Sequence, residues 1–367
     1  MRVFKYKLYR NRRQRRLAYS IGAYASVWNH FIALHRRYYQ RTGRYLPKYR
    51  AQLHLTRLKK TRRFGWWRQL DAQACQDVIE RIDRAYVAFF NQATRRPPKF
   101  RSGRLYSSFT LKQAGYQLTE GALWLGKGNN KQRFSFFQSR PVEGTIRRIT
   151  IRRDRVGDVW ISVLTDADEE VQVPRLDRRN SAGADFGLKT FLTLSDGTRI
   201  QSPRFLFDDP KQLRRASQAV SSKRPVSGNR RRARLALARL HRKAANRRAE
   251  FHWQTAHWLC DRYDRLVLED LNLRGMARLW GRKVHDLGFG DFLLKLGHIA
   301  AKKGTQIVFA DRWYPSTKTC SACDTQREID LSERVFECEH CGHTIDRDLN
   351  AARNLSRWAM PPMQETA

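Results

Sequence analysis

Acidic residues are missing from two long stretches of this 367-residue chain. No Asp or Glu precedes Asp71, although the first seventy residues contain twenty Lys and Arg, and residues 211–249 contain fourteen basic residues and no acid. The whole chain has 73 Lys and Arg against 34 Asp and Glu, which gives a formal net charge of +39. Such an excess requires a polyanionic partner, and nucleic acid is favoured over the alternative, an anionic membrane surface.

Long apolar runs and disulfide spacing are also missing. Uncharged residues 17–35 follow a basic segment, as in a signal peptide or membrane anchor, but they contain polar residues and their apolar residues recur at helical spacing. We interpret them as an amphipathic core helix. The six cysteines include two close pairs, a pattern typical of a metal site in a reducing compartment, and Cys75 and Cys260 stand apart as core thiols.

Hydrophobic residues make up 41% and aromatic residues 11% of the chain, too many for a disordered basic tail, so the chain should fold. The pattern predicts a strand at 4–8 and helices at 14–40 and 71–91, and then the period changes to two. Short strands are predicted at 108–111, 123–125, 133–137, 146–152 and 159–163, which indicates a small barrel or sandwich. From residue 181 strands alternate with helices, which predicts an α/β sheet: strands 182–187, 191–194, 266–268 and 306–309, a basic helix pair 211–261 hinged at 225–228, and a helix 292–303 capped by Gly304.

Two C-x-x-C pairs, Cys320 with Cys323 and Cys338 with Cys341, are separated by fourteen residues. Each pair is typical of a zinc knuckle, and two knuckles together complete a closed shell of four thiolates around a structural zinc ion. His340 and His343 are possible substitutes as ligands, and unpaired or redox-active cysteines are the alternative interpretation.

Three acidic residues lie where a strand or helix would bring them against the core. Asp185 ends the segment Gly-Ala-Asp, Glu269 follows Leu-Val-Leu, and Asp348 opens the predicted last helix. Carboxylates at strand ends of an α/β sheet can converge on a pair of Mg²⁺ ions that act on a phosphodiester. Unrelated strand-end and helix-cap roles are the alternative. A kinase is excluded, although Asp185 begins an Asp-Phe-Gly tripeptide, because no glycine-rich phosphate loop or His-Arg-Asp loop accompanies it.

Four motifs occur in a specific order: Gly183-Ala-Asp-Phe-Gly-Leu-Lys, Leu268-Glu-Asp-Leu-Asn-Leu, Tyr314-Pro-Ser-Thr-Lys-Thr-Cys-Ser-Ala-Cys and Asp346-Arg-Asp-Leu-Asn-Ala-Ala-Arg-Asn. From about Gly183 to Leu355 the chain resembles the TnpB family, transposon-encoded nucleases related to type V CRISPR effectors. Asp324 departs from the pattern, because many relatives have Gly there, although Asp tolerates a left-handed turn. The first half resembles the family by pattern more than by motif, so residues that read a flanking DNA motif cannot be carried over.

The resemblance implies a multidomain α+β protein. Its parts would be a β-barrel wedge domain (1–10 and 97–178), a helical recognition domain (11–96), a RuvC, RNase H-like α/β nuclease domain (179–312 and 343–359, with a basic helical hairpin at 209–261), an inserted zinc ribbon (313–342) and a tail (360–367). It also implies that Asp185, Glu269 and Asp348 form the metal-binding catalytic triad, with Asp346 as the alternative third member.

The expected function is an RNA-guided DNA endonuclease that uses two Mg²⁺ ions, with Mn²⁺ as an alternative, and a structural Zn²⁺. Its partners would be a guide RNA and double-stranded DNA with a short flanking motif. Tyr45, Trp66 and Trp67 could stack on bases, but core packing is favoured for each. We expect a monomer with one RNA, with oligomers left open, in the prokaryotic cytoplasm and at the nucleoid when bound to DNA. A nuclease-inactive guided DNA-binding regulator and a strand-joining transposase are the alternatives.

Overall fold

The computed structural model describes residues 1–126, 128, 131–168, 171–173, 180–206, 210–330 and 333–358. The chain divides into two compact units, unit 1 (Met1–Glu169) and unit 2 (Glu170–Ala367). The predicted domain boundary at 178/179 and the predicted tail at 360–367 lie outside the described residues. Among the described helices, none combines the length and the apolar character that a membrane span requires.

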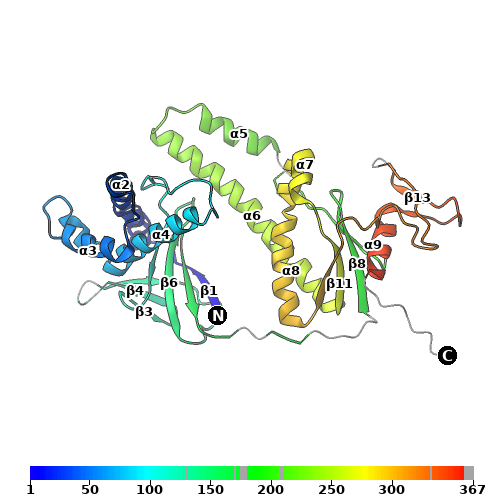
Figure 1. The fold of residues 1–367 in the computed structure, drawn as a ribbon, viewed down its shortest axis with the longest axis horizontal. Coiled ribbons are helices and arrows are strands. Elements are labelled where there is room, and N and C mark those ends of the chain that lie inside the picture. Colours follow the sequence, from blue (N-terminus) through cyan, green and yellow to red (C-terminus); the bar gives the residue numbers. More distant parts are fainter. Residues whose placement is uncertain are drawn as a thin grey trace. The chain divides into compact units, whose positions relative to one another are not determined.

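Unit 1 contains two antiparallel sheets (Figure 1). The first has the strand order β1-β7-β6-β2 and the second the order β3-β4-β5. An isolated bridge between Leu8 and Phe136 links them. The strands are β1 (Arg2–Lys7), β2 (Ser108–Leu111), β3 (Tyr116–Thr119), β4 (Ala122–Leu125), β5 (Gln132–Ser135), β6 (Ile146–Arg153) and β7 (Val159–Thr165). Buried and partly exposed residues alternate along β7. In this strand every second residue from Val159 is buried, as expected for a strand with one face on a core.

A helical block follows β1 in the sequence: α1 (Arg12–Ser20), the 3₁₀ turn η1 (Ile21–Ala23), α2 (Tyr24–Thr42), α3 (Lys48–Leu58), the 3₁₀ turn η2 (Gly65–Gln69) and α4 (Ala72–Phe90). Its apolar stripes share one hydrophobic core with the inner faces of the sheets. Asp71 caps α4, accepting hydrogen bonds from the backbone of Gln73 and Ala74. The predicted helix at 14–40 is interrupted at η1, where Gly22 and Gly103 approach so closely that a Cβ on Gly22 would lie 2.6 Å from the carbonyl oxygen of Gly103.

Unit 2 is built on a mixed sheet of order β10-β9-β8-β11-β12. Its strands are β8 (Ser181–Phe186), β9 (Thr190–Leu194), β10 (Arg199–Gln201), β11 (Arg265–Glu269) and β12 (Gln306–Ala310). Strands β8, β11 and β12 run parallel, whereas β9 and β10 are antiparallel to their neighbours. The predicted α/β sheet is therefore present.

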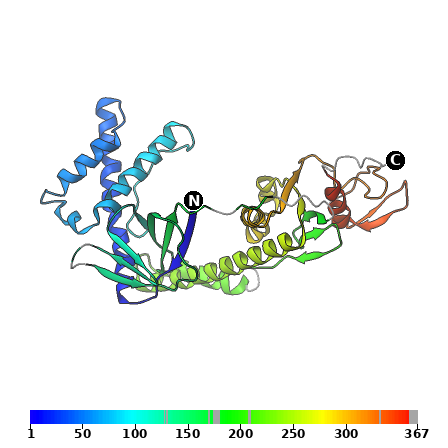
Figure 2. The same ribbon diagram turned by 90° about the horizontal axis from the view of Figure 1, so that it is seen from below.

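Helices cover both faces of this sheet. The described helices of unit 2 are α5 (Pro210–Ser221), α6 (Gly228–Arg262), α7 (Leu273–Leu287), α8 (Phe289–Lys303) and α9 (Arg347–Arg357). Alternate residues such as Ala184 and Leu268 face the core formed with α6 and α8, whereas Val267 faces Leu355 of α9. The first half of α6 extends beyond the core, since the buried residues of this helix begin at Ala244 (Figure 2).

Two short strands, β13 (Val335–Glu337) and β14 (Thr344–Asp346), form the antiparallel hairpin of the cysteine-rich segment. The sequence did not predict the helices α3 and α7 or the short strands β3, β10, β13 and β14. The expected barrel is represented, within the described residues, by the two bridged sheets of unit 1.

Candidate functional site

Asp185 and Glu269 lie side by side at the carboxyl ends of two parallel strands. Leu268 of β11 pairs with Ala184 of β8, so the next residue on each strand is Glu269 and Asp185. Because side chains alternate along a strand, both acids point to the face opposite the α6–α8 core, which is the face that α9 covers. The sequence prediction that these two acids converge agrees with this register.

The start of α9 brings a third acid to the same face. Asp348 is in the first turn of α9 and keeps 28% of its side-chain surface exposed. Helix α9 packs on β8 at Gly183, where a Cβ would lie only 2.0 Å from the carbonyl oxygen of Ala352. A glycine two residues before Asp185 therefore lets the helix approach the strand closely enough to bring Asp348 near it.

Burial and the other two acids perturb the ionisation of Asp185. Burial raises the pKa of Asp185 well above its ordinary value, and the negative charges of Glu269 and Asp348 raise it further. The pKa of Glu269 is also raised, by burial and then by the adjacent Asp270. All three residues are partly rather than fully buried. Like charges gathered in a partly desolvated space favour either protonation or a bound cation.

Neighbouring acids have other partners. Asp346 caps α9 by accepting from the backbone N–H of Leu349, and its second oxygen lies 3.0 Å from Arg199. Asp270 pairs with Arg312. Asp348 contacts Arg347 at 3.5 Å, a longer and weaker contact. Of the two candidates for the third acid, Asp348 thus has the freer carboxylate.

The donor set of this acidic cluster suits hard divalent cations, which prefer carboxylate oxygens. Within the described residues, no three carboxylates have oxygens that all lie within 4.8 Å of one another, a distance that only the cysteine group meets. The acids therefore do not form the compact ligand shell of a single ion. Two ions about 3.5–4 Å apart are held by ligands that spread over a larger distance.

The four cysteines form a compact group. The sulfur atoms of Cys320, Cys323, Cys338 and Cys341 all lie within 4.8 Å of one another. The Cys320–Cys341 and Cys323–Cys338 sulfurs are 3.8 Å and 3.5 Å apart, close to the roughly 3.8 Å expected for a tetrahedral ion with Zn–S bonds of about 2.3 Å. This group contains neither His340 nor His343. The arrangement fits zinc.

The thiols of this group cannot all ionise easily on their own. Hydrogen bonding with Thr325 lowers the pKa of Cys323 to about 5. The backbone N–H of His343 favours the thiolate of Cys341, but the neighbouring sulfurs outweigh it and raise the pKa of Cys341 to about 12. A cation would relieve this conflict. Asp324, which follows the first knuckle, adopts a φ of 60°, the left-handed conformation that Asp tolerates where many relatives have Gly.

Two buried asparagines connect the cysteine group to the acidic cluster. Asn350 of α9 donates to the Thr319 carbonyl at 2.7 Å and accepts from the Ser321 N–H at 2.9 Å. Asn354 donates to the carbonyls of Ser316 at 2.7 Å and Thr319 at 2.6 Å. This contact was not predicted from the sequence. The sequence feature that could have indicated it is a pair of Asn residues, Asn350 and Asn354, four positions apart and therefore on one face of the predicted last helix.

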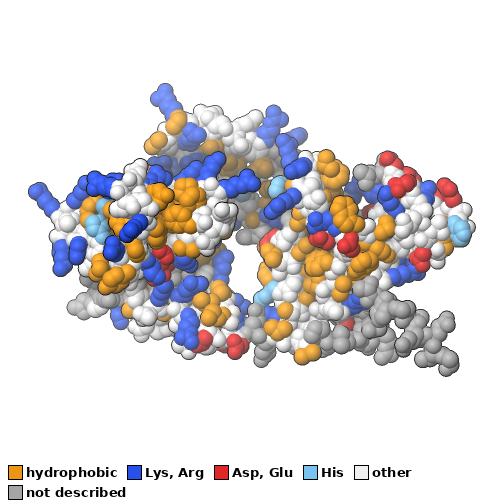
Figure 3. Space-filling model, viewed as in Figure 1, with side chains coloured by type: hydrophobic (Ala, Val, Ile, Leu, Met, Phe, Trp, Pro, Cys, Tyr) orange, Lys and Arg blue, Asp and Glu red, His pale blue; other side chains and the backbone are white. Residues whose placement is uncertain are grey.

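Basic side chains cover much of the surface, as the blue atoms on the helices of unit 1 and on the α5–α6 hairpin show (Figure 3). Of the aromatic residues considered for stacking, Trp67 is fully buried, Tyr45 packs partly buried against Tyr86, and Trp66 is 44% exposed. Core packing is therefore the role of Trp67. Cys75 and Cys260 are buried, as predicted for core thiols.

Comparison with known proteins agrees with these features. Two family models match, "Probable transposase" (OrfB_IS605) over residues 162–279 and "Cas12f1-like, TNB domain" over residues 289–355. A Streptomyces pristinaespiralis protein named "Putative RNA-guided DNA endonuclease" is 27% identical over 96% of this chain and 88% of its own length. A "TnpB-like protein" of Acanthamoeba polyphaga mimivirus is 27% identical over 61% of this chain and 45% of its own length.

A solved structure shares the fold. The protein of a Cas12f1–sgRNA–target DNA complex superimposes with a TM-score of 0.56 at 14% sequence identity, covering 95% of this chain and 83% of that chain. The two family models lie on the elements that carry the acids and the cysteines, and the relatives extend the similarity along almost the whole chain. The chain is thus similar to TnpB-like proteins in both matched segments and, through the Streptomyces relative, along almost its whole length.

Proposed function

We propose that the chain is an RNA-guided DNA endonuclease whose nuclease site is formed by Asp185, Glu269 and Asp348. The observation that carries the proposal is the register of β8 and β11, which places Asp185 and Glu269 side by side on the face that α9 covers. Burial, with the charges of Glu269 and Asp348, raises the pKa of Asp185. Clustered carboxylates with perturbed pKa values are typical of functional sites. A structural role is disfavoured, because a stable core would pair these charges with cations or avoid them.

The three acids would hold two Mg²⁺ ions, with Mn²⁺ as the alternative. Bound ions of this kind lower the pKa of an attacking water and stabilise the oxygen that leaves the phosphodiester. The chain's own residues prepare the site. Gly183 lets α9 approach β8, the cap at Asp346 fixes the first turn of α9, and Asp348 is thereby oriented toward the strand ends. Arg347, next to Asp348, acts to lower the pKa of Asp185 and so favours its ionised form.

Both nucleic acids enter the proposal through charge and relatives. A net charge of +39 can neutralise phosphates on more than one nucleic-acid strand. The Streptomyces relative is named for RNA-guided cleavage of DNA. Guide pairing would read the target sequence, while the protein would read helix shape and a short flanking motif.

The finer assignments belong to the same proposal. Residues 1–10 and 97–178 would be the wedge domain, 11–96 the recognition domain, 179–312 and 343–359 the RuvC domain, and 313–342 the zinc ribbon. Zinc bound by Cys320, Cys323, Cys338 and Cys341 would have a structural role, since a shell of four thiolates leaves no open position. The expected working state is a monomer with one RNA in the prokaryotic cytoplasm.

Cleavage of a plasmid tests the function. The protein is purified with the RNA that it carries, and that RNA is sequenced. The complex is then mixed with a plasmid that contains the matching target sequence. We expect double-strand breaks with Mg²⁺ or Mn²⁺ and none without added divalent ions. Asp185→Asn should abolish cleavage and retain RNA binding, whereas Asp270→Asn, which removes an acid paired with Arg312, should retain both.

The same assay separates the alternatives. Guided binding without breaks under any divalent ion identifies a regulator, and joined DNA products identify a transposase. Full cleavage by Asp185→Asn would refute the proposed site. Binding should also weaken steeply with salt, since each neutralised phosphate adds about 0.7–0.9 to the log–log slope; a flat titration would contradict the assignment of a nucleic-acid partner.

A further inference from the structure

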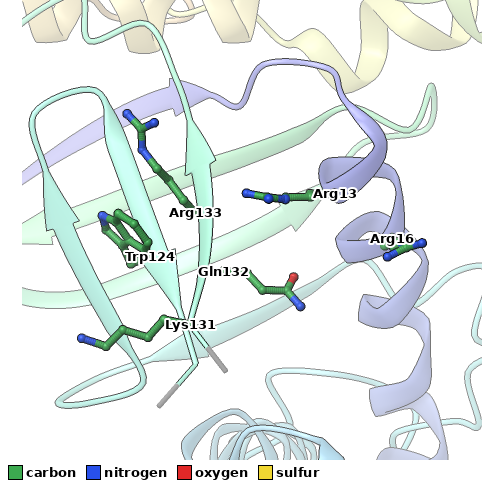
Figure 4. A pocket seen from close by; sticks show the side chains of 6 residues that line it. All are labelled: Arg13, Arg16, Trp124, Lys131, Gln132 and Arg133. Atoms are coloured by element: carbon green, nitrogen blue, oxygen red, sulfur yellow. The ribbon is translucent and has the colours of Figure 1, made fainter. Parts of the chain in front are cut away.

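A basic pocket lies in unit 1, between α1 and the edge strand β5 (Figure 4). Its volume is about 410 Å³, and it is lined by Arg13, Arg16, Trp124, Lys131, Gln132 and Arg133. Arg13 and Gln132 lie on the α1 side of β5, whereas Trp124, Lys131 and Arg133 lie on the other side (Figure 4). The pocket thus curves around the first residues of the strand.

The β3-β4-β5 sheet has one core face and one open face. Leu123 and Phe134 are buried in the core of unit 1, so their neighbours Trp124 and Arg133 must point the other way. Gln117, Trp124 and Arg133 are paired across the three strands and form one row on the open face. A second hollow of about 620 Å³ continues along this face and shares Trp124, Lys131 and Arg133 with the first.

The charged residues that line the pocket are all cations. Four of its six lining residues are cations and none is an acid, and Glu120 is the one acid lining the adjoining hollow. Arg13, Arg16 and Arg133 are exposed, and the ion pairs found across the described residues do not include them. The Lys131 ammonium donates to the side-chain oxygen of Gln117 at 3.3 Å and, within the described part of the chain, pairs with no carboxylate. An anion can therefore approach these cations without first displacing a carboxylate.

Trp124 supplies an aromatic surface among these charges. It is partly exposed, and among the ring and cation contacts of the described residues none involves its indole. By contrast, Trp160 on the other sheet is covered by Lys5 and Lys7. A tryptophan left uncovered on an open sheet face, with an amide and a guanidinium beside it in the same row, resembles the stacking platforms that bind unpaired bases.

We propose that this pocket binds an unpaired nucleotide, with its base stacked on Trp124 and its flanking phosphates held by Arg13, Arg16 and Arg133. Gln117 is the register partner of Trp124 on the neighbouring strand, and its amide N–H can donate a hydrogen bond to the edge of the base. A base-paired duplex does not fit, because its base faces are already stacked and Trp124 would have no partner. An acidic peptide is disfavoured for the same reason, since carboxylates have no flat face to stack on the indole.

The proposal rests on the proposed function only in taking nucleic acid as the partner. An unpaired nucleotide can come from RNA or from a DNA strand, so the test uses both. Twelve-residue oligonucleotides with 4-thiouridine or 4-thiothymidine are irradiated with the full-length chain, without added magnesium and at moderate salt, and the cross-linked peptides are identified by mass spectrometry. We expect a cross-link in residues 116–135 with one or both single strands and none there with the matching duplexes.

Matched variants make the result specific. Trp124→Ala should remove the cross-link and weaken single-strand binding roughly 5- to 150-fold, the range for loss of one base–aromatic stack. Phe137→Ala, which removes an aromatic ring 69% exposed just beyond β5, should change neither. Arg13→Gln with Arg16→Gln should reduce the salt slope by about 1.4, whereas Arg12→Gln with Arg15→Gln, on the same helix but outside the pocket, should keep the cross-link at Trp124.

Three results would overturn the proposal: no cross-link in residues 116–135 with either single strand, equal cross-linking with the duplexes, or equal weakening by the pocket pair and the control pair of arginines. Cross-linking by RNA alone or by DNA alone assigns the source of the nucleotide. Because no step requires cleavage, a failure of the nuclease proposal would leave this outcome unchanged. The arginine variants change only exposed side chains, so they test the pocket even if Trp124→Ala does not fold.

Discussion

Replacement of Asn350 and Asn354 by leucine tests how α9 is held to the cysteine group. Both side chains are almost completely buried, and together they make four hydrogen bonds to backbone groups of residues 316–321. Asn350→Leu leaves the Ser321 N–H without its partner, and Asn354→Leu does the same to the Ser316 carbonyl. A buried polar group that loses its partner costs about 1–3 kcal/mol, so each single variant should be destabilised by about that amount.

The double variant should lose more than the sum of the two. Asn350 and Asn354 donate to the same carbonyl oxygen, that of Thr319, so either single replacement leaves it one partner. Only the double variant removes both. The extra cost is that of the buried Thr319 carbonyl, which then has no hydrogen-bond partner from α9. We therefore expect a coupling free energy of about 1–3 kcal/mol in a double-mutant cycle.

Zinc release in urea provides the assay. The zinc-loaded protein is equilibrated at increasing urea concentrations, and the released ion is measured with a chromophoric chelator, which gives the free energy of opening this segment. Arg353→Leu, an exposed change on the same helix, is the control and should have little effect. Additive losses in the double variant would refute the shared-carbonyl argument, and single losses no larger than that of Arg353→Leu would refute the role of the asparagines altogether.

Three further predictions concern other parts of the chain. Gly183→Ala should destabilise unit 2 by about 1–3 kcal/mol or more, because its Cβ would overlap the backbone of α9, whereas Gly228→Ala, in open space, should not; thermal unfolding compares them. Elemental analysis should find zinc in the wild type and in Cys260→Ser but not in Cys338→Ser, since only the latter removes a member of the four-sulfur group. Burial lowers the pKa of His35 from 6.5 to about 4. Between these two pH values the unfolded chain binds more protons than the folded chain, so the free energy of unfolding falls as the pH falls from 6.5 to 4. His35→Phe should recover up to about 3 kcal/mol of that loss, measured by urea unfolding at pH 4 and pH 6.5. Equal pH dependence of the variant and the wild type would contradict this.

Strong local periodicity allowed much of the fold to be predicted. The pattern at 71–91 corresponds to α4, and the strand at 108–111 coincides with β2. The elements that were missed have weak patterns. Helix α3 buries only Ala51 and Leu55, and β3 is a four-residue strand whose pattern alternates between partly buried and exposed. Helix α7 contains two glycines, and Trp280 within it has non-helical dihedral angles.

The candidate site could be predicted only in part, for a related reason. Asp185 and Glu269 follow apolar strands, and the paired cysteines have a characteristic spacing, so both groups leave a signal in the sequence. The contacts that position α9 leave almost none. The partners of the two asparagines are backbone groups, and the atoms that require Gly183 to be glycine lie in a helix about 170 residues away. Backbone partners have no residue identity that a pattern could reveal.

The pairing of the first strand with β7 has a consequence for synthesis. Arg2 pairs with Thr165, so the ribosome must translate the whole helical block and five more strands before β1 can join its sheet. At roughly 5–20 residues per second this takes on the order of 10–30 s. During this time the nascent strand has a free edge that could pair with other chains, and its alternating Lys5 and Lys7, both exposed in the finished fold, disfavour such pairing by charge repulsion. The same lysines thus disfavour aggregation of the first-synthesised strand during the time before its partner strand exists.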